Sequence, residues 1–170
     1  MREWITAFFM AWGMFLAIPC PCKRWDERAR QKMLVCLPLV GLVVGGVWAV
    51  LALLLRGAPV GLRALLLIPA ATRACAGLAV MHLRPMGTSQ YAAMRRGGAD
   101  LTAALWIFLA LAVGLPIWLA GSFAPLAAAV GYGLAAWYGF RQLDGMSGDI
   151  SGFALTVGEL VGAATLLYVG

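Results

Sequence analysis

The sequence predicts an all-α protein: a polytopic membrane helix bundle of about five spanning helices, with a short re-entrant or interfacial helix near the N-terminus. Three observations predict this fold class. Hydrophobic residues make up 63% of the 170 residues and charged residues only 12%, whereas soluble domains carry about 25% charged residues. The apolar residues fall in runs of roughly the 20 residues that cross a bilayer. The 21 glycines are scattered through these runs, as in membrane bundles, where small residues let helices approach closely.

The N-terminal apolar segment, 4–18, is too short to cross a bilayer. Arg2 is balanced by Glu3, and no A-x-A cleavage pattern follows the segment, so we expect a retained re-entrant or interfacial helix rather than a signal peptide. The first span is expected at 34–55, an uninterrupted apolar run. Its Gly41-x-x-x-Gly45 pattern is typical of closely packed membrane helices and carries no chemistry of its own.

Four further spans complete the expected bundle, at 64–83, 101–120, 123–140 and 150–169. The first of these is interrupted by Pro69 and Arg73, and the second holds no charge. The third follows a tight turn and ends near Trp137-Tyr138, an aromatic pair typical of a membrane interface. The last carries Glu159 at its middle. No repeat or second domain is visible, so we expect one integral membrane domain over residues 1–170.

Lys and Arg concentrate in three connections that would share one end of the bundle: 19–33, 84–100 and 141–149. The connections at the other end hold only Arg56 and Arg63. Because cytoplasmic loops carry an excess of Lys and Arg, we expect a multi-pass protein of the bacterial cytoplasmic membrane. Its functional site should lie on the cytoplasmic face.

The net charge of +6 does not indicate a nucleic-acid-binding protein. The basic residues all flank predicted helices, where Lys and Arg set topology, so we expect the lipid bilayer and no nucleic acid as a partner. Of the four cysteines, Cys20 and Cys22 form a C-x-C pair without the second pair of a zinc site. No disulfide is expected on a reducing cytoplasmic side.

The most informative polar stretch is 143–152, which precedes the last span. Asp144 and Asp149 flank Gly145 and Gly148, so the backbone can bend to bring both carboxylates to one point. Mg²⁺ commonly binds one or two carboxylates together with substrate phosphates, and Ser147 could add a hydroxyl. Two other interpretations remain open: Ser147 or Asp149 caps the last helix, and Asp144 is an ordinary solvated carboxylate.

Glu159 and Arg73 are the ionisable residues expected inside the bundle. Glu159 lies about 15 Å into its span at 1.5 Å per residue, and a charged group at that depth is a functional hypothesis by default. Arg73 could bind a phosphate bidentately. The alternative is that the two residues pair with each other, or that Glu159 is held protonated.

Basic residues of the 84–100 connection could steer an anionic substrate: Arg84, Arg95 and Arg96. They could equally be topology anchors. His82, the one histidine, cannot make a metal site alone and is interpreted as interfacial.

Three stretches together resemble the cobalamin synthase (adenosylcobinamide-GDP ribazoletransferase) family. The opening helix from Ala7-Phe8-Phe9 to Ile18-Pro19-Cys20-Pro21 resembles a family helix ending in I-P-x-P. Residues 37–45, LPLVGLVVG, resemble its F-P-L-x-G-x-x-x-G span, and Thr72-Arg73 stands where Ser-Arg is usual. Residues 145–152, GMSGDISG, with Glu159-Leu160 resemble its closing G-x-[ST]-G-D-x-x-G…E-L signature.

The sequence departs from the family pattern at two places. Family members carry an H-L-D-G-x-x-D-x-x-D-type segment associated with Mg²⁺, whereas between Leu55 and Thr72 the only polar residues here are arginines. The chain therefore resembles a shortened member. Asp144 stands where glycine is usual, which suggests a partial replacement ligand.

The resemblance implies a transferase that joins adenosylcobinamide-GDP to α-ribazole or α-ribazole 5'-phosphate and releases GMP, with Mg²⁺ as cofactor. It implies catalytic roles for Asp149 and Glu159 and metal ligation by Asp149 and Asp144. The substrate-binding residues expected are Arg73, Ser147, Gly148, Arg84 and Arg95.

Two other functions stay open. A catalytically inactive shortened paralogue would bind a corrinoid or a partner subunit. As partners of the chain itself, a second copy in a homo-oligomer and a partner membrane subunit both stay open. A small transporter would line its path with Arg73 and Glu159, although no paired half-helices support it.

Overall fold

The structure is a computed structural model that describes residues 2–15, 20, 22, 26–56, 62–87 and 98–169. In this part of the chain the elements are helices: α1 (Arg2–Phe15), the short 3-10 helix η1 (Glu27–Ala29), α2 (Arg30–Arg56), α3 (Leu62–His82), α4 (Ala99–Ala120), α5 (Ala124–Leu143) and α6 (Gly148–Val169). The predicted all-α helical membrane bundle is confirmed.

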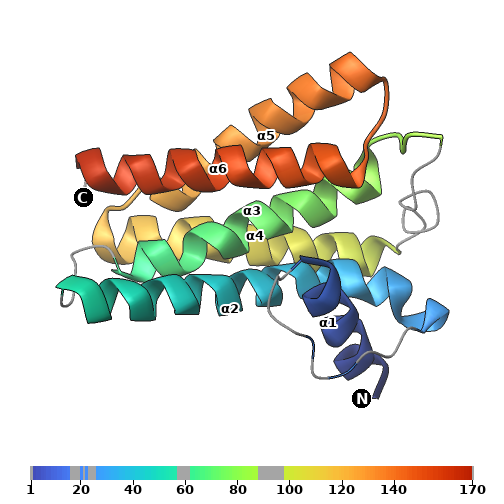
Figure 1. The fold of residues 1–170 in the computed structure, drawn as a ribbon, viewed down its shortest axis with the longest axis horizontal. Helices are drawn as coiled ribbons and strands as arrows, with labels where there is room; N and C mark the ends of the chain where they lie inside the picture. The colour runs from blue at the N-terminus through green and yellow to red at the C-terminus, as the bar shows by residue number, and fades with distance from the viewer. Residues whose placement is uncertain are drawn as a thin grey trace.

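The helix α3 is the centre of the bundle, because it packs against α2, α4, α5 and α6. Figure 1 shows α2, α3, α4 and α6 running side by side along the long axis, whereas α5 crosses α6 and diverges from it toward the α5–α6 connection. The helix α5 packs closely against α6 and α3 but contacts α4 at few positions. A space between α4 and α5 therefore remains at one flank of α3.

Four of the described helices are long and apolar enough to cross a membrane, over Lys32–Leu53, Ala64–His82, Ala99–Ala120 and Gly148–Tyr168. The fifth expected span forms the 20-residue helix α5 but is not among these four. Its glycines, the Trp137-Tyr138 pair and Arg141 in its last turn lower its hydropathy. Helix formation at 123–140 is thus confirmed, while α5 is less apolar than the other spans.

The Gly41-x-x-x-Gly45 motif packs α2 against α3, as the sequence predicts. A Cβ atom added at Gly45 would lie 2.0 Å from the Leu66 carbonyl oxygen, and one at Gly41 would lie 2.4 Å from the Pro69 carbonyl oxygen. Only glycine permits backbones to approach this closely. The motif therefore fixes the position of the part of α3 that leads to Arg73.

The N-terminal helix α1 is too short to span and crosses α2 near the start of that helix (Figure 1). Its small buried face, Ala7, Met10 and Ala11, packs on α2. Near the start of α1, Lys32 of α2 forms an ion pair with Glu3, and the Lys32 ammonium lies 5.4 Å from the centre of the Trp4 ring. These contacts fit the interfacial helix that the sequence predicts.

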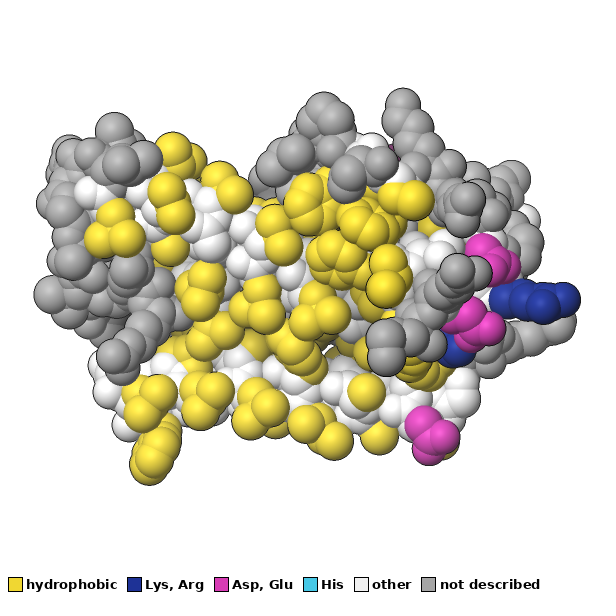
Figure 2. Space-filling view, turned by 90° about the horizontal axis from the view of Figure 1, so that it is seen from below, with side chains coloured by type: hydrophobic (Ala, Val, Ile, Leu, Met, Phe, Trp, Pro, Cys, Tyr) yellow, Lys and Arg dark blue, Asp and Glu magenta, His cyan; other side chains and the backbone are white. Residues whose placement is uncertain are grey.

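The polar connections share one end of the bundle. The start of α2, the end of α3, the start of α4 and the α5–α6 connection all lie at the right in Figure 1. Figure 2 shows the described charged side chains of one face gathered at that same end, while hydrophobic side chains cover the flank. A flank without charge is what a lipid-facing surface requires.

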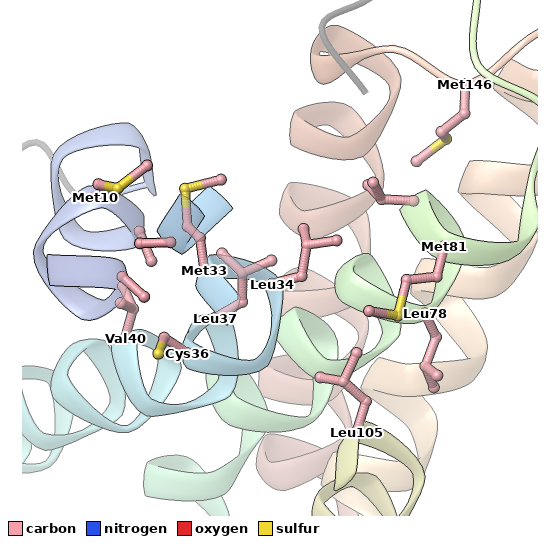
Figure 3. Close-up of a cluster of buried hydrophobic side chains, with 14 of the residues drawn as sticks. Met10, Met33, Leu34, Cys36, Leu37, Val40, Leu78, Met81, Leu105 and Met146 are labelled. Atoms are coloured by element: carbon pink, nitrogen blue, oxygen red, sulfur yellow. The ribbon is translucent and has the colours of Figure 1, made fainter. Parts of the chain in front are cut away.

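The main hydrophobic cluster lies close to this polar end (Figure 3). It joins α1, α2, α3 and α4 through Met10, Leu34, Leu37, Leu78, Met81 and Leu105. Met146, from the connection between α5 and α6, is fully buried in the same cluster. This one side chain anchors the polar connection to the core.

Candidate active site

The connection between α5 and α6, residues 144–147, is held against the segment that follows α3. The N–H of Met86 donates to the carbonyl of Met146 at 3.0 Å, and the N–H of Met146 donates to the carbonyl of Arg84 at 2.7 Å. These two hydrogen bonds make a short parallel bridge between Pro85 and Met146. Two connections that are far apart in sequence therefore form one structure at the polar end.

Backbone conformation explains the glycine and the aspartate of this connection. A Cβ atom at Gly145 would lie 2.8 Å from the Cα of Met86 and 2.9 Å from its nitrogen, so this position requires glycine. Asp144 ends α5 in the left-handed region, with φ of 52°. That conformation favours glycine and is also adopted by Asp. It therefore explains why the family usually has glycine at this position and why Asp144 can take its place.

Ser147 caps α6. The N–H of Ile150 donates to the Ser147 hydroxyl oxygen at 3.3 Å, and the N–H of Ser151 donates to the Ser147 carbonyl at 3.1 Å. Of the two capping residues that the sequence left open, Ser147 is therefore the one that caps.

Asp149 lies in the first turn of α6 next to Gly148, and both residues are exposed. Its carboxylate has no hydrogen bond or ion pair with any described residue. A negative charge is stabilised in the first turn by the helix dipole. With respect to the described residues, the Asp149 carboxylate is thus available to a ligand.

Arg84 contacts Asp144 rather than standing free. Its guanidinium donates to the Asp144 carbonyl at 3.0 Å and forms an ion pair with the Asp144 carboxylate. Both side chains are exposed, so the pair contributes little to stability, about 0–1 kcal/mol. An anion or a cation at this end can therefore separate the pair at low cost. Arg95 and Arg96 lie outside the described residues.

Arg73 and Glu159 meet inside the bundle. The Arg73 guanidinium forms an ion pair with the Glu159 carboxylate and also donates to the Pro69 carbonyl at 3.3 Å. The Thr72 hydroxyl lies 3.5 Å from the same Glu159 oxygen. The side chains of Arg73 and Glu159 are only 8% and 16% exposed, respectively. Of the alternatives that the sequence left open, the structure therefore contains the one in which Arg73 and Glu159 pair with each other.

The predicted site residues thus form two groups. One group lies at the polar end and comprises Arg84, Asp144, Ser147, Gly148 and Asp149; the other is the Arg73–Glu159 pair. Ten residues of α6 separate Asp149 from Glu159, about 15 Å along the helix. One metal ion cannot bind both carboxylates at that separation.

No group of three or more His, Cys, Asp or Glu side chains that could hold a metal occurs among the described residues. The described part of the polar end offers the exposed carboxylates of Asp149 and Asp144. Mg²⁺ commonly binds one or two carboxylates and completes its shell with substrate phosphates and water. These donors fit a magnesium ion that arrives with a phosphate substrate, and they do not form a cage of protein ligands.

Arg141 is a further residue of the polar end that sequence reasoning did not single out. Its guanidinium carbon lies 5.1 Å from the centre of the Trp137 ring. The four-residue spacing of Trp137 and Arg141, about one helical turn, is the signal in the sequence that indicates this contact.

Comparison with known proteins identifies the family. The sequence model of the cobalamin-5-phosphate synthase family matches residues 7–68 and 57–167. The two matches overlap at 57–68, within the stretch where the acidic segment of the family is absent from this sequence. No solved structure matches.

Curated relatives match over a shorter stretch. The adenosylcobinamide-GDP ribazoletransferase of Clostridium botulinum (strain Eklund 17B / Type B) is 40% identical over 48 residues, which is 28% of this chain and 19% of the relative. The enzyme of the same name from Clostridium perfringens (strain 13 / Type A) is 35% identical over 48 residues, again 28% of this chain and 19% of the relative. That of Lachnoclostridium phytofermentans is 33% identical over 46 residues, 27% of this chain and 18% of the relative.

Each of these matches therefore covers about a fifth of the relative's length. The family match, in contrast, extends over most of the chain. The chain is a helical membrane protein that belongs to the cobalamin-5-phosphate synthase family.

Proposed function

We propose that the protein is a transferase of cobalamin biosynthesis that joins adenosylcobinamide-GDP to α-ribazole or α-ribazole 5'-phosphate and releases GMP. The observation that carries the proposal is the ordered G-M-S-G-D turn of the family signature, residues 145–149, at the polar end of the bundle. The turn follows Asp144, which pairs with Arg84, and ends at the exposed Asp149. Family membership supplies the chemistry that such a turn would serve.

The reaction is a displacement at phosphorus. A hydroxyl of α-ribazole attacks the corrinoid-side phosphorus of the pyrophosphate, and a new P–O bond forms. The bond from that phosphorus to the bridging oxygen breaks, GMP leaves with the bridging oxygen, and the hydroxyl proton passes to solvent at the exposed turn. Positioning and charge neutralisation supply most of the catalysis in such a step.

The residues of the polar end have separate roles in this proposal. Asp149, together with Asp144, would hold Mg²⁺, which neutralises charge on the pyrophosphate when it is bound. Arg84 would exchange its contact with Asp144 for a phosphate oxygen. The Ser147 cap fixes the start of α6, and Gly148 leaves the phosphates room to approach its backbone.

Glu159 and Arg73 contribute to the same function from a distance. Because they pair with each other inside the bundle, we assign them a positioning role. They hold α6 against α3 and so fix the position of the signature turn along the bundle axis. Direct contact of either residue with the pyrophosphate is not part of this proposal.

A second candidate function is that of an inactive paralogue that binds a corrinoid or a partner membrane subunit. Two observations favour it: the acidic segment is absent between Leu55 and Thr72, and no acidic cluster suited to a metal occurs in the described part of the chain. A partner subunit or a second copy would then supply the missing carboxylates.

Growth on cobinamide tests the two functions against each other. The chain is expressed in a bacterial strain that lacks its own cobalamin synthase, beside Asp149→Ala and Asp100→Ala. Asp100 is the matched control, because it is an exposed aspartate in the first turn of α4. The transferase proposal expects cobalamin-dependent growth with the native chain and Asp100→Ala, but not with Asp149→Ala. Absence of growth with a native chain that is folded in the membrane would favour the inactive paralogue.

A further inference from the structure

A cavity of about 320 Å³ opens between α3, α4 and α5, close to the signature turn. It lies where α4 and α5 have few contacts. Ligand sites of small molecules span roughly 300–1,000 Å³, so this cavity holds a small ring system rather than a whole corrinoid.

Four aromatic side chains line this cavity, among aliphatic and small residues. Trp106 comes from α4, whereas Tyr132, Trp137 and Phe140 come from α5. Tyr132 is fixed, since its hydroxyl lies 3.3 Å from the Ser151 hydroxyl of α6. Base rings stack on such side chains regardless of their substituents. The wall is therefore suited to a planar aromatic heterocycle.

The cavity contains space that a side chain could fill. A Cβ atom added at Gly133, which lines the cavity, would meet no atom within 4 Å. Two further lining residues, Ala79 and Ala136, carry only a methyl group. On α5 small residues thus alternate with the aromatic residues that line the cavity.

The lining of the cavity comes close to the signature turn on two helices, α5 and α3. Phe140 precedes Asp144 by four residues, about 6 Å along α5, and His82 precedes Arg84 by two residues. Arg141 stacks on Trp137 at 5.1 Å, which places an exposed positive charge at the same rim. A ring inside the cavity can therefore carry a sugar and a phosphate toward the turn.

We propose that this cavity binds the aromatic heterocycle of the acceptor nucleoside, with Arg141 at its rim facing the 5'-phosphate when the acceptor carries one. The proposal rests on the transferase function proposed above. It assigns the acceptor to the α4–α5 side of the polar end and leaves the pyrophosphate donor at the signature turn.

Equilibrium binding tests the proposal without requiring turnover. The full chain in lipid nanodiscs is titrated with α-ribazole by calorimetry, beside Gly133→Leu and Gly114→Leu. Gly114 is the matched control, because it is an exposed helical glycine in α4 with open space around it and does not line the cavity. We expect Gly133→Leu to weaken binding at least about tenfold, since the added side chain occupies the space of the ring, and Gly114→Leu to leave it unchanged.

A second pair of variants removes a wall instead of filling the space. Trp106→Leu should weaken α-ribazole binding by about 5- to 150-fold, the range for loss of one stacking contact. Trp118→Leu is its control, because Trp118 lies on the same helix, is 82% exposed and does not line the cavity. Arg141→Gln should weaken binding of α-ribazole 5'-phosphate more than binding of α-ribazole.

The outcomes separate this proposal from the proposed function. Binding that depends on Gly133 and Trp106 in a chain without turnover supports the cavity assignment and contradicts the transferase. Turnover with unchanged α-ribazole affinity in Gly133→Leu overturns the cavity assignment alone. Absence of α-ribazole binding to a folded native chain overturns both.

Two other occupants are distinguished in the same samples. Lipids brominated along their acyl chains quench tryptophan fluorescence on contact. If Gly133→Leu reduces that quenching but not α-ribazole affinity, the cavity holds an acyl chain and the proposal is wrong. If Gly133→Leu changes only the oligomeric state, the cavity is an interface between copies, and the proposal is equally wrong.

Discussion

Arg73 and Glu159 are opposite charges inside a bundle whose flanks are apolar. Removing one partner of a buried pair leaves an uncompensated charge, whereas replacing both by apolar side chains does not. We expect Arg73→Met and Glu159→Leu each to lower the free energy of unfolding by about 3–5 kcal/mol. The double variant should be more stable than either single variant.

Unfolding in mixed micelles by added SDS measures this double-mutant cycle. Thr156→Val, at an exposed position of the same helix α6, serves as a control that should change stability little. Additive losses in the double variant would contradict a mutual pairing of Arg73 and Glu159.

Gly145 has no room for a side chain because the Met86 backbone lies against it. In Gly145→Ala the added Cβ atom must push the two connections apart and disrupt the bridge between Pro85 and Met146. We expect at least about a tenfold loss of transferase activity, since catalytic geometry tolerates little displacement. Gly87→Ala, three residues beyond Arg84 in an open part of the same segment, should retain activity.

Transferase activity, measured in membranes that contain equal amounts of each variant, tests this prediction. Equal activity of Gly145→Ala and Gly87→Ala would show that the bridge does not hold the signature turn in place.

The sequence predicted most of the residues of the candidate site but not their partners. Asp149, Ser147 and Glu159 were identifiable from motif and depth, because a charged group in an apolar run is unusual. The contact of Arg84 with Asp144 joins residues 60 positions apart, and periodicity contains no information about such pairs. For the same reason the sequence could not choose between a phosphate and Glu159 as the partner of Arg73.

At the level of elements, α1 contacts α2 through the Glu3–Lys32 ion pair as well as through its buried apolar face. The hydrogen bond from Lys32, its positive charge and a smaller effect of Arg28 lower the pKa of Glu3 below its ordinary value of 4.5. A lowered pKa in the folded state means that the contact stabilises above the unfolded pKa and is lost as the pH falls through the folded one.

We therefore expect amide exchange of α1 to speed up, after correction for the intrinsic rate, as the pH falls below about 4.5. Glu3→Gln should show this faster exchange already at pH 7 and lose the pH dependence. Asp100→Asn, in α4, is the control. Exchange of α1 that stays slow in Glu3→Gln would show that its apolar contacts alone dock the helix.

Helix positions were predictable because apolar runs, glycine spacing and turns are local features. The Gly41–Gly45 packing and the turn after α4, where Gly121 has φ of 62°, both follow from local sequence. The space between α5 and α4 was not predictable, because it depends on which neighbouring helices pack on α5 and not on the residue pattern of α5 itself.

At the scale of the whole molecule, the polar connections share one end, as the Lys and Arg distribution predicts (Figure 1). The C-terminal end of α6 lies at the opposite end of the bundle (Figure 1). If the polar end is cytoplasmic, alkaline phosphatase fused after Gly170 should be active and a fluorescent protein fused there should be dark. The reverse pattern would place the signature turn outside the cytoplasm.

The central claim is that this chain carries out the transfer itself with the carboxylates it has. The most direct measurement is release of GMP from adenosylcobinamide-GDP by the purified chain, with and without α-ribazole and with Mg²⁺ varied. We expect GMP release that requires α-ribazole and Mg²⁺, persists in Asp100→Asn and falls at least about a hundredfold in Asp149→Asn, the range for loss of a key charge-stabilising group. Release of no GMP by a folded native chain that binds both substrates would contradict the claim.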